Sequence, residues 1–108
     1  MWLITTQGFY SVVAHRDDPD RLLVRSRVRG DLEALRMQIP GSEPVETPEA
    51  DYRWRVEVTR DEWRVALVAL SEDIDYDNFK NAVGERCGWE RERVYHDVWA
   101  DLLSLQRP

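Results

Sequence analysis

Four arginines have the spacing of an anion-binding surface. Arg25 and Arg27 alternate with Val24, Ser26 and Val28 in one predicted strand. Arg53 and Arg55 alternate in the same way in a second one. Because successive side chains of a strand point to opposite faces, the apolar residues face a core and the guanidinium groups face outward. If the two strands are neighbours, the four arginines form one patch that could hold phosphate or carboxylate groups through bidentate hydrogen bonds.

This patch alone does not predict a nucleic-acid site. Sheets that bind single-stranded RNA carry aromatic platforms on the same face, and the alternation places Tyr52 and Trp54 on the opposite, core-facing side. The net charge of −6 also repels nucleic acid at long range. The sequence therefore favours a solvated face with partners such as Glu57, and leaves nucleic-acid or nucleotide binding as an alternative.

Asp73, Asp75 and Asp77 have the spacing at which a calcium-binding EF-hand loop begins. The rest of that pattern fails, because Asn78 stands where the loop needs glycine and Gly84 stands where it needs a bidentate glutamate. Asp75 or Asp77 is instead expected to cap the helix that follows. With two histidines and one cysteine in the chain, no metal site is predicted.

Cys87 and His96 are candidates for a thiolate–imidazole pair, in which Asp97 or Asp101 would orient the imidazole ring. Nothing in their spacing requires contact, and neither has a catalytic signature around it. Cys87 lies on the apolar side of its predicted helix, as a small hydrophobic residue would. We therefore predict no catalytic residue and no cofactor. A small hydrolase or transferase that uses His96 is kept as a third function.

The last predicted helix carries more apolar surface than one packing contact needs. Val94, Tyr95, Val98, Leu102 and Leu105 are expected on its buried side, and Trp99 and Leu103 widen this apolar arc. Trp89 lies at the start of the same helix, where an exposed indole could anchor a partner. These features predict an interface at Trp89, Trp99 and Leu103, with a homodimer as one option. A helix wedged within its own domain is the alternative.

Hydrophobic periodicity predicts the elements that position these residues. Strands are expected within 2–14 (one or two), at 21–28 and at 51–59, and helices within 31–39, from 60 to 74, within 79–87 and from 89 to 105. Gly8 suggests a bulge or a bend, Thr59 to Glu62 form a capping box, and 40–50 is expected to be a loop. The fold class is α+β, with a small antiparallel sheet of about three strands and helices packed on one face. The expected order is β-β-α-β-α-α-α.

Length and composition set the class of protein. At 108 residues the chain has the size of one α+β domain, taken as 1–108. Hydrophobic residues make up 43% and charged residues 33%, which is too apolar for a disordered chain and too charged for a membrane protein. We expect a cytoplasmic location, because the sequence has no signal-peptide pattern, no membrane-length apolar run and a single cysteine.

Four stretches of the chain carry a resemblance to other sequences. They are Met1–Val13, Val28–Leu35, Ile74–Lys80 and Val94–Trp99. Together they resemble a family of short uncharacterised bacterial and bacteriophage proteins with no established activity. The resemblance implies a free-standing cytoplasmic protein and carries over no catalytic residue or cofactor. An interaction or inhibitory role fits it by analogy alone.

The leading functional expectation is a non-enzymatic interaction protein that works through the last helix or the open sheet face. Its partner is another protein or a second copy of the chain. Binding of nucleic acid or nucleotide through the arginines is the alternative, and the net charge of −6 disfavours it. No membrane partner is expected.

Overall fold

The computed structural model describes residues 1–36 and 43–107. The chain divides into two compact units, Met1–Asp75 and Tyr76–Pro108, and each is described by itself. The predicted end of the first helix at Ile39 to Gly41 lies outside the described residues.

The first unit contains a five-stranded antiparallel sheet in the order β1-β2-β3-β5-β4. Its strands are β1 (Trp2–Ile4), β2 (Phe9–Ala14), β3 (Arg21–Ser26), β4 (Val45–Glu46) and β5 (Trp54–Thr59). The predicted α+β class and antiparallel sheet are confirmed, and the strand number of about three is wrong. The stretch 2–14 forms two strands, and the predicted loop contributes β4 at the sheet edge.

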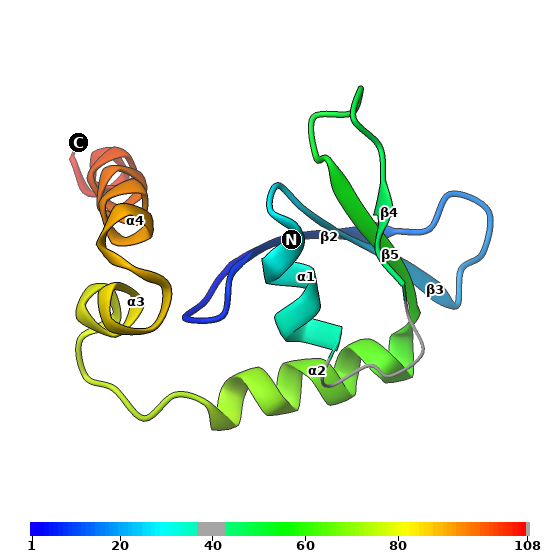
Figure 1. Cartoon of the computed structure of the whole chain (residues 1–108), viewed down its shortest axis with the longest axis horizontal. Helices are drawn as coiled ribbons and strands as arrows, with labels where there is room; N and C mark the ends of the chain where they lie inside the picture. The colour runs from blue at the N-terminus through cyan, green and yellow to red at the C-terminus, as the bar shows by residue number, and fades with distance from the viewer. Residues whose placement is uncertain (37–42, 108) are drawn as a thin grey trace. The chain divides into compact units, whose positions relative to one another are not determined.

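Two helices cover one face of this sheet: α1 (Arg29–Arg36) and α2 (Arg60–Glu72) (Figure 1). Every second residue of β3, beginning at Leu22, is buried against them, as period-two alternation requires. The buried residues of this core come from three strands and both helices: Tyr10, Val12, Leu22, Val24, Leu32, Leu35, Val56, Val58, Trp63, Ala66 and Leu70. The opposite face of the sheet carries the arginines.

Gly8 lies in the turn between β1 and β2, where Thr5 N–H donates to the Gly8 carbonyl at 2.9 Å. A side chain at this position would collide with Asp31, because an added Cβ would lie 2.4 Å from the Asp31 Cγ. Asp31 is buried and accepts a hydrogen bond from Phe9 N–H at 3.0 Å. Gly8 therefore serves close packing between the turn and α1, and of the bulge or bend predicted here the structure has a bend, the β1–β2 hairpin turn.

Helix α2 begins with the predicted capping box. Glu62 N–H donates to Thr59 Oγ1 at 3.0 Å, and Thr59 N–H donates to Glu62 Oε1 at 2.7 Å. Trp63, Ala66 and Leu70 are buried on its sheet side. The helix was predicted to run to residue 74, but it ends at Glu72 with Asp73 as its C-cap, and Ile74 is exposed.

The second unit is a pair of helices, α3 (Phe79–Cys87) and α4 (Trp89–Leu102), followed by a 3₁₀ turn, η1 (Leu103–Gln106) (Figure 1). Asn78 caps α3, so the prediction that Asp75 or Asp77 caps it is wrong. Gly88 joins the helices with φ of 99°, a conformation that favours glycine. The Phe79 and Tyr95 rings stack with their centroids 6.1 Å apart.

Helix α4 is less buried than its sequence predicted. Tyr95 is its one buried residue within the described part of the chain. Val94, Leu102 and Leu105 were expected on the buried side and are exposed. A single neighbouring helix can cover only one side of α4, so the rest of its apolar arc stays open. No helix in the described ranges has the length and apolar character of a membrane span.

Candidate functional site

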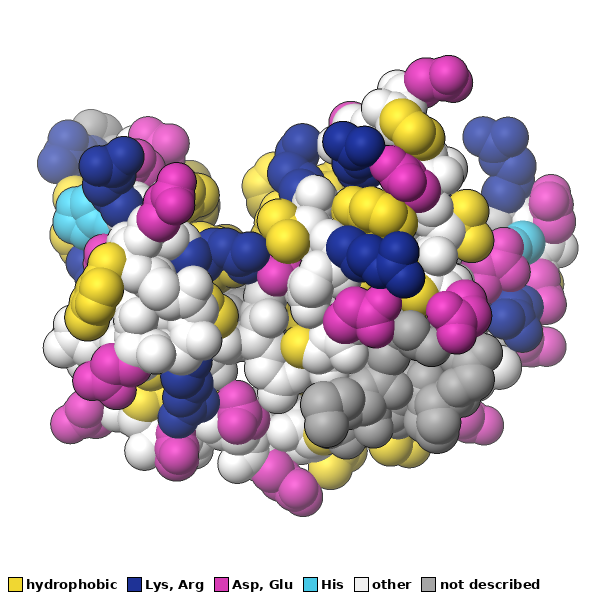
Figure 2. All heavy atoms as spheres, viewed as in Figure 1, with side chains coloured by type: hydrophobic (Ala, Val, Ile, Leu, Met, Phe, Trp, Pro, Cys, Tyr) yellow, Lys and Arg dark blue, Asp and Glu magenta, His cyan; other side chains and the backbone are white. Residues whose placement is uncertain are grey.

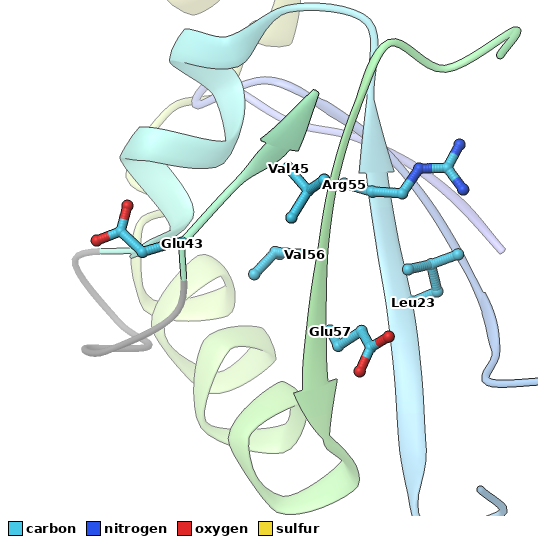
Figure 3. A pocket seen from close by; sticks show the side chains of 6 residues that line it. All are labelled: Leu23, Glu43, Val45, Arg55, Val56 and Glu57. Atoms are coloured by element: carbon cyan, nitrogen blue, oxygen red, sulfur yellow. The ribbon is translucent and has the colours of Figure 1, made fainter. Parts of the chain in front are cut away.

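The register of the sheet brings the predicted arginines together. Strands β3 and β5 are antiparallel neighbours, and Arg25 lies directly opposite Arg55. Arg27 follows the end of β3 and Arg53 precedes β5, so both lie next to this pair. The alternation in β5 also holds, because half-buried Trp54 packs against the core. Figure 3 shows Arg55 and Leu23 extending to one side of the sheet and Val56 to the other.

Arg25 and Arg55 are anchored by neutral groups. Arg25 Nη2 donates to Ser11 Oγ at 2.7 Å, and its buried Nε finds no acceptor in the described ranges. Arg55 Nε donates to Thr47 Oγ1 at 3.0 Å. Within residues 1–36 and 43–107, neither guanidinium forms an ion pair with a carboxylate. Both positive charges are therefore held in place without being neutralised.

Arg27 and Arg53 differ in how they are paired. Arg27 Nη1 donates to the Asp51 carbonyl at 2.9 Å and forms no ion pair within the described residues. Arg53 Nη2 lies 2.7 Å from Glu46 Oε1 of β4, so its charge is compensated. Glu57, which was expected to neutralise the arginines, pairs instead with His15 and Arg21.

Tyr52 lies on the arginine side, and its predicted place on the core side is wrong. Its ring centroid is 4.6 Å from the Arg25 Cζ and 4.7 Å from the Arg27 Cζ. Strand β5 begins only at Trp54, and Tyr52 N–H donates to the carboxylate of Asp51 at 2.9 Å. The alternation of the strand therefore does not extend to Tyr52.

An aromatic row continues from Tyr52 toward the sheet edge. Tyr52 contacts the Phe9 ring with the centroids 6.3 Å apart, and Phe9 meets the Trp2 ring edge to face at 6.1 Å. Trp2 is 73% exposed. We call this surface the arginine–aromatic face; it consists of Trp2, Phe9, Arg25, Arg27, Tyr52 and Arg55. Neither Trp2 nor Phe9 was assigned to it from the sequence, although pairing of 2–14 as a hairpin would have placed them there.

The surroundings of the face are mixed in charge. Figure 2 shows dark blue, magenta and yellow side chains alternating over the sheet of the first unit on the side in view. Beside Arg55 lies a shallow hollow of about 340 Å³, lined by Leu23, Glu43, Val45, Arg55, Val56 and Glu57 (Figure 3). The arrangement suits a ligand that combines anionic groups with apolar surface better than a long polyanion.

Among the residues that the structure describes, no carboxylate orients His96. Its ring is exposed, lies 3.1 Å through Nδ1 from the Lys80 Nζ, and stacks with Trp99 at 5.5 Å. Within the described ranges neither Asp97 nor Asp101 hydrogen-bonds to it. The orientation of His96 by a carboxylate, considered with the alternative of a hydrolase or transferase, is therefore not provided by these contacts.

The predicted interface residues all lie in the second unit. Trp89 and Trp99 are exposed, whereas Leu103 is half-buried at the start of η1. The Trp89 ring packs over Gly84, where an added Cβ would lie 2.1 Å from its Cζ3.

Asp73 of the acidic segment accepts a hydrogen bond from Thr6 Oγ1 at 2.9 Å. In the described part of the chain, no group of three or more His, Cys, Asp or Glu side chains is placed to hold a metal ion.

Comparison with protein-family models, curated proteins and solved structures finds no match for this chain.

Proposed function

We propose that this chain is a non-enzymatic protein-interaction module, located in the cytoplasm, whose arginine–aromatic face binds a partner. The partner presents carboxylates beside an apolar or aromatic group. The observation that carries the proposal is the set of guanidinium groups at Arg25, Arg27 and Arg55, which are held in place next to exposed Trp2 and are not neutralised by any carboxylate of the residues that the structure describes.

The composition of the face matches that of energetic centres in protein interfaces. Arginine, tyrosine and tryptophan are the residues in which interface binding energy concentrates. Each guanidinium already donates a hydrogen bond to Ser11, Asp51 or Thr47, and this bond fixes its orientation. A pre-positioned guanidinium loses less conformational entropy when a carboxylate binds, and the pair gains charge-assisted hydrogen bonds.

The net charge of the chain restricts how such a partner is recognised. At −6 the molecule repels acidic proteins at long range. Recognition must therefore come from short-range contacts with the three arginines and the aromatic row. An apolar or aromatic group in the partner would bury against Trp2 and Phe9, whose rings are in contact.

The test is a titration by fluorescence anisotropy. A fluorescein-labelled peptide rich in Asp and Glu with a central Phe is the probe, and a peptide of the same length with Ser in place of the acids is the reference. We expect the acidic peptide to bind more tightly. Arg25→Gln or Arg55→Gln should weaken it at least about tenfold, since a hydrogen bond to a charged group contributes about 1.5–3 kcal/mol.

Arg64→Gln is the matched control, because Arg64 is an exposed arginine of α2 paired with Asp61. It should leave the affinity unchanged. Equal weakening by Arg64→Gln and Arg55→Gln would show that only overall charge matters, and would contradict the proposal. Far-UV circular dichroism of each variant establishes that it is folded.

Binding of single-stranded nucleic acid is a second candidate, supported by the position of Tyr52 on the arginine side. Sheets that bind single strands combine basic residues with aromatic platforms, and the objection that the aromatic side chains face the core no longer applies to Tyr52, although Trp54 does pack against the core. Against it stands the coverage of the Tyr52 ring, which is only 4% exposed beneath two guanidinium groups. Salt-dependent binding of oligo(dT), lost in Trp2→Ala, would favour this candidate over the acidic peptide.

A further inference from the structure

Helix α4 carries an apolar surface that is only partly covered, with Val98 half-buried and Val94, Leu102 and Leu105 exposed. Val94, Val98 and Leu102 recur at every fourth position, and Leu105 extends the row into η1. Residues at this spacing lie along one side of a helix. Leu102 is 55% exposed and Leu105 is 81% exposed. We call these four residues the α4 stripe.

A row of carboxylates borders the α4 stripe. Glu90, Asp97 and Asp101 occur at positions i, i+7 and i+11, which at about 100° per residue places them in one line beside the stripe. All three are exposed, and in residues 1–36 and 43–107 none of them pairs with a cation. Arg91 lies closest to the stripe, and its Nη1 donates to Tyr95 Oη at 3.2 Å within the unit.

We propose that the α4 stripe docks an amphipathic helix of a partner protein, and that this helix carries Lys or Arg along the border of its own apolar face. The stripe runs for about 16 Å, or three helical turns, which matches the contact length of helix-in-groove recognition. Basic residues on the incoming helix would lie opposite Glu90, Asp97 and Asp101, which have no cationic partner of their own in the described chain.

The charges argue against a second copy as the occupant. A second copy would bring the same three carboxylates to the border of the stripe, and like charges across an interface oppose association. The α4 stripe belongs to the second unit, whereas the arginine–aromatic face belongs to the first. The stripe selects a basic partner, and the arginine–aromatic face selects an acidic one. The inference therefore does not depend on the function proposed for that face.

The probe is a helical peptide built from Leu and Lys with its Leu residues at helical spacing, and its matched reference has Glu in place of Lys. Both are fluorescein-labelled and titrated with the full chain. We expect the Leu/Lys peptide to bind at least tenfold more tightly. Leu102→Glu should weaken it at least tenfold, and Leu105→Glu provides the same test at a more exposed position. Val65→Glu on α2, where Val65 is 58% exposed, is the control and should have no effect.

A charge exchange tests the carboxylate row. Asp97→Lys combined with Asp101→Lys should reverse the preference toward the Leu/Glu peptide. Asp17→Lys combined with Glu72→Lys changes the net charge equally at exposed positions outside α4 and should leave the preference unchanged. The proposal is overturned if the wild-type chain binds both peptides equally, or if Val65→Glu is as damaging as Leu102→Glu. It is also overturned if light scattering finds a dimer that Leu105→Glu dissociates, because the occupant is then a second copy.

Discussion

The Tyr52 ring supports two guanidinium groups of the arginine–aromatic face and contacts Phe9. Its removal would leave a cavity beneath Arg25 and Arg27. We therefore expect Tyr52→Ala to lower the free energy of unfolding by about 3 kcal/mol, the usual cost of truncating a buried aromatic residue. Urea unfolding followed by circular dichroism measures this loss.

Tyr52→Phe is the matched control for that truncation. In the part of the chain that the structure describes, the Tyr52 hydroxyl forms no hydrogen bond with another protein group. The Phe variant keeps the ring and should unfold within about 0.5 kcal/mol of the wild type. Equal losses in the two variants would mean that the ring does not hold the arginines.

Substitution by alanine is expected to have opposite effects on stability at Gly8 and at Gly30. Gly8→Ala forces a Cβ against the Asp31 side chain, so we expect a loss of about 1–3 kcal/mol in the free energy of unfolding. Gly30→Ala places a Cβ within α1 no closer than 4.0 Å to Val28 Cγ1, an uncrowded position, and should be neutral or stabilising. Thermal unfolding of both variants distinguishes them. A stable Gly8→Ala variant would contradict the close packing of the β1–β2 turn on Asp31.

At the scale of elements, the capping box at Thr59 and Glu62 sets the start of α2. Thr59→Ala removes the acceptor for Glu62 N–H, which should cost about 1 kcal/mol of stability. Ser71→Ala removes a hydroxyl from the exposed end of the same helix and should change stability by less than about 0.5 kcal/mol. The midpoints of urea unfolding compare the two. A loss that is no larger in Thr59→Ala would rule out a stabilising role for the box.

The elements that depend on local sequence could be predicted, and those that depend on pairing could not. Alternation in 21–26 and 54–59 correctly predicted that Arg25 and Arg55 point away from the core, because a strand with one buried face allows a single side-chain pattern. Strand β4 has two residues and is recognisable only from its pairing with β5. The predicted side of Tyr52 was wrong because β5 begins only at Trp54. Tyr52, whose N–H donates to the Asp51 carboxylate, lies before the strand and does not follow its alternation.

The last helix shows a limit of hydrophobic periodicity. The apolar arc of α4 predicted burial, and the structure leaves Val94, Leu102 and Leu105 exposed. A sequence pattern shows which side of a helix is apolar, but not whether a covering element exists. The same exposed residues make α4 a candidate interface, as was expected for Trp89 and Trp99.

At the scale of the whole molecule, the main hydrophobic core belongs entirely to the first unit. Every residue of that cluster lies between Tyr10 and Leu70. We therefore expect a chain of residues 1–75 to unfold cooperatively, whereas residues 76–108, with few buried side chains, should not fold alone. Thermal melts of the two fragments test this. Absence of a cooperative transition in 1–75 would contradict the division.

The claim that Arg25, Arg27 and Arg55 form a prepared contact surface is tested most directly by NMR of the arginine Nε–Hε groups. The acidic Phe-containing peptide is added to the full ¹⁵N-labelled chain. We predict that the Nε signals of these three arginines and the indole signal of Trp2 shift together along one binding curve, while the Nε signal of Arg64 and the indole signal of buried Trp63 stay in place. If Arg64 shifts as much as Arg55, or if no arginine signal moves at saturating peptide, the arginine–aromatic face is not a binding surface for carboxylates.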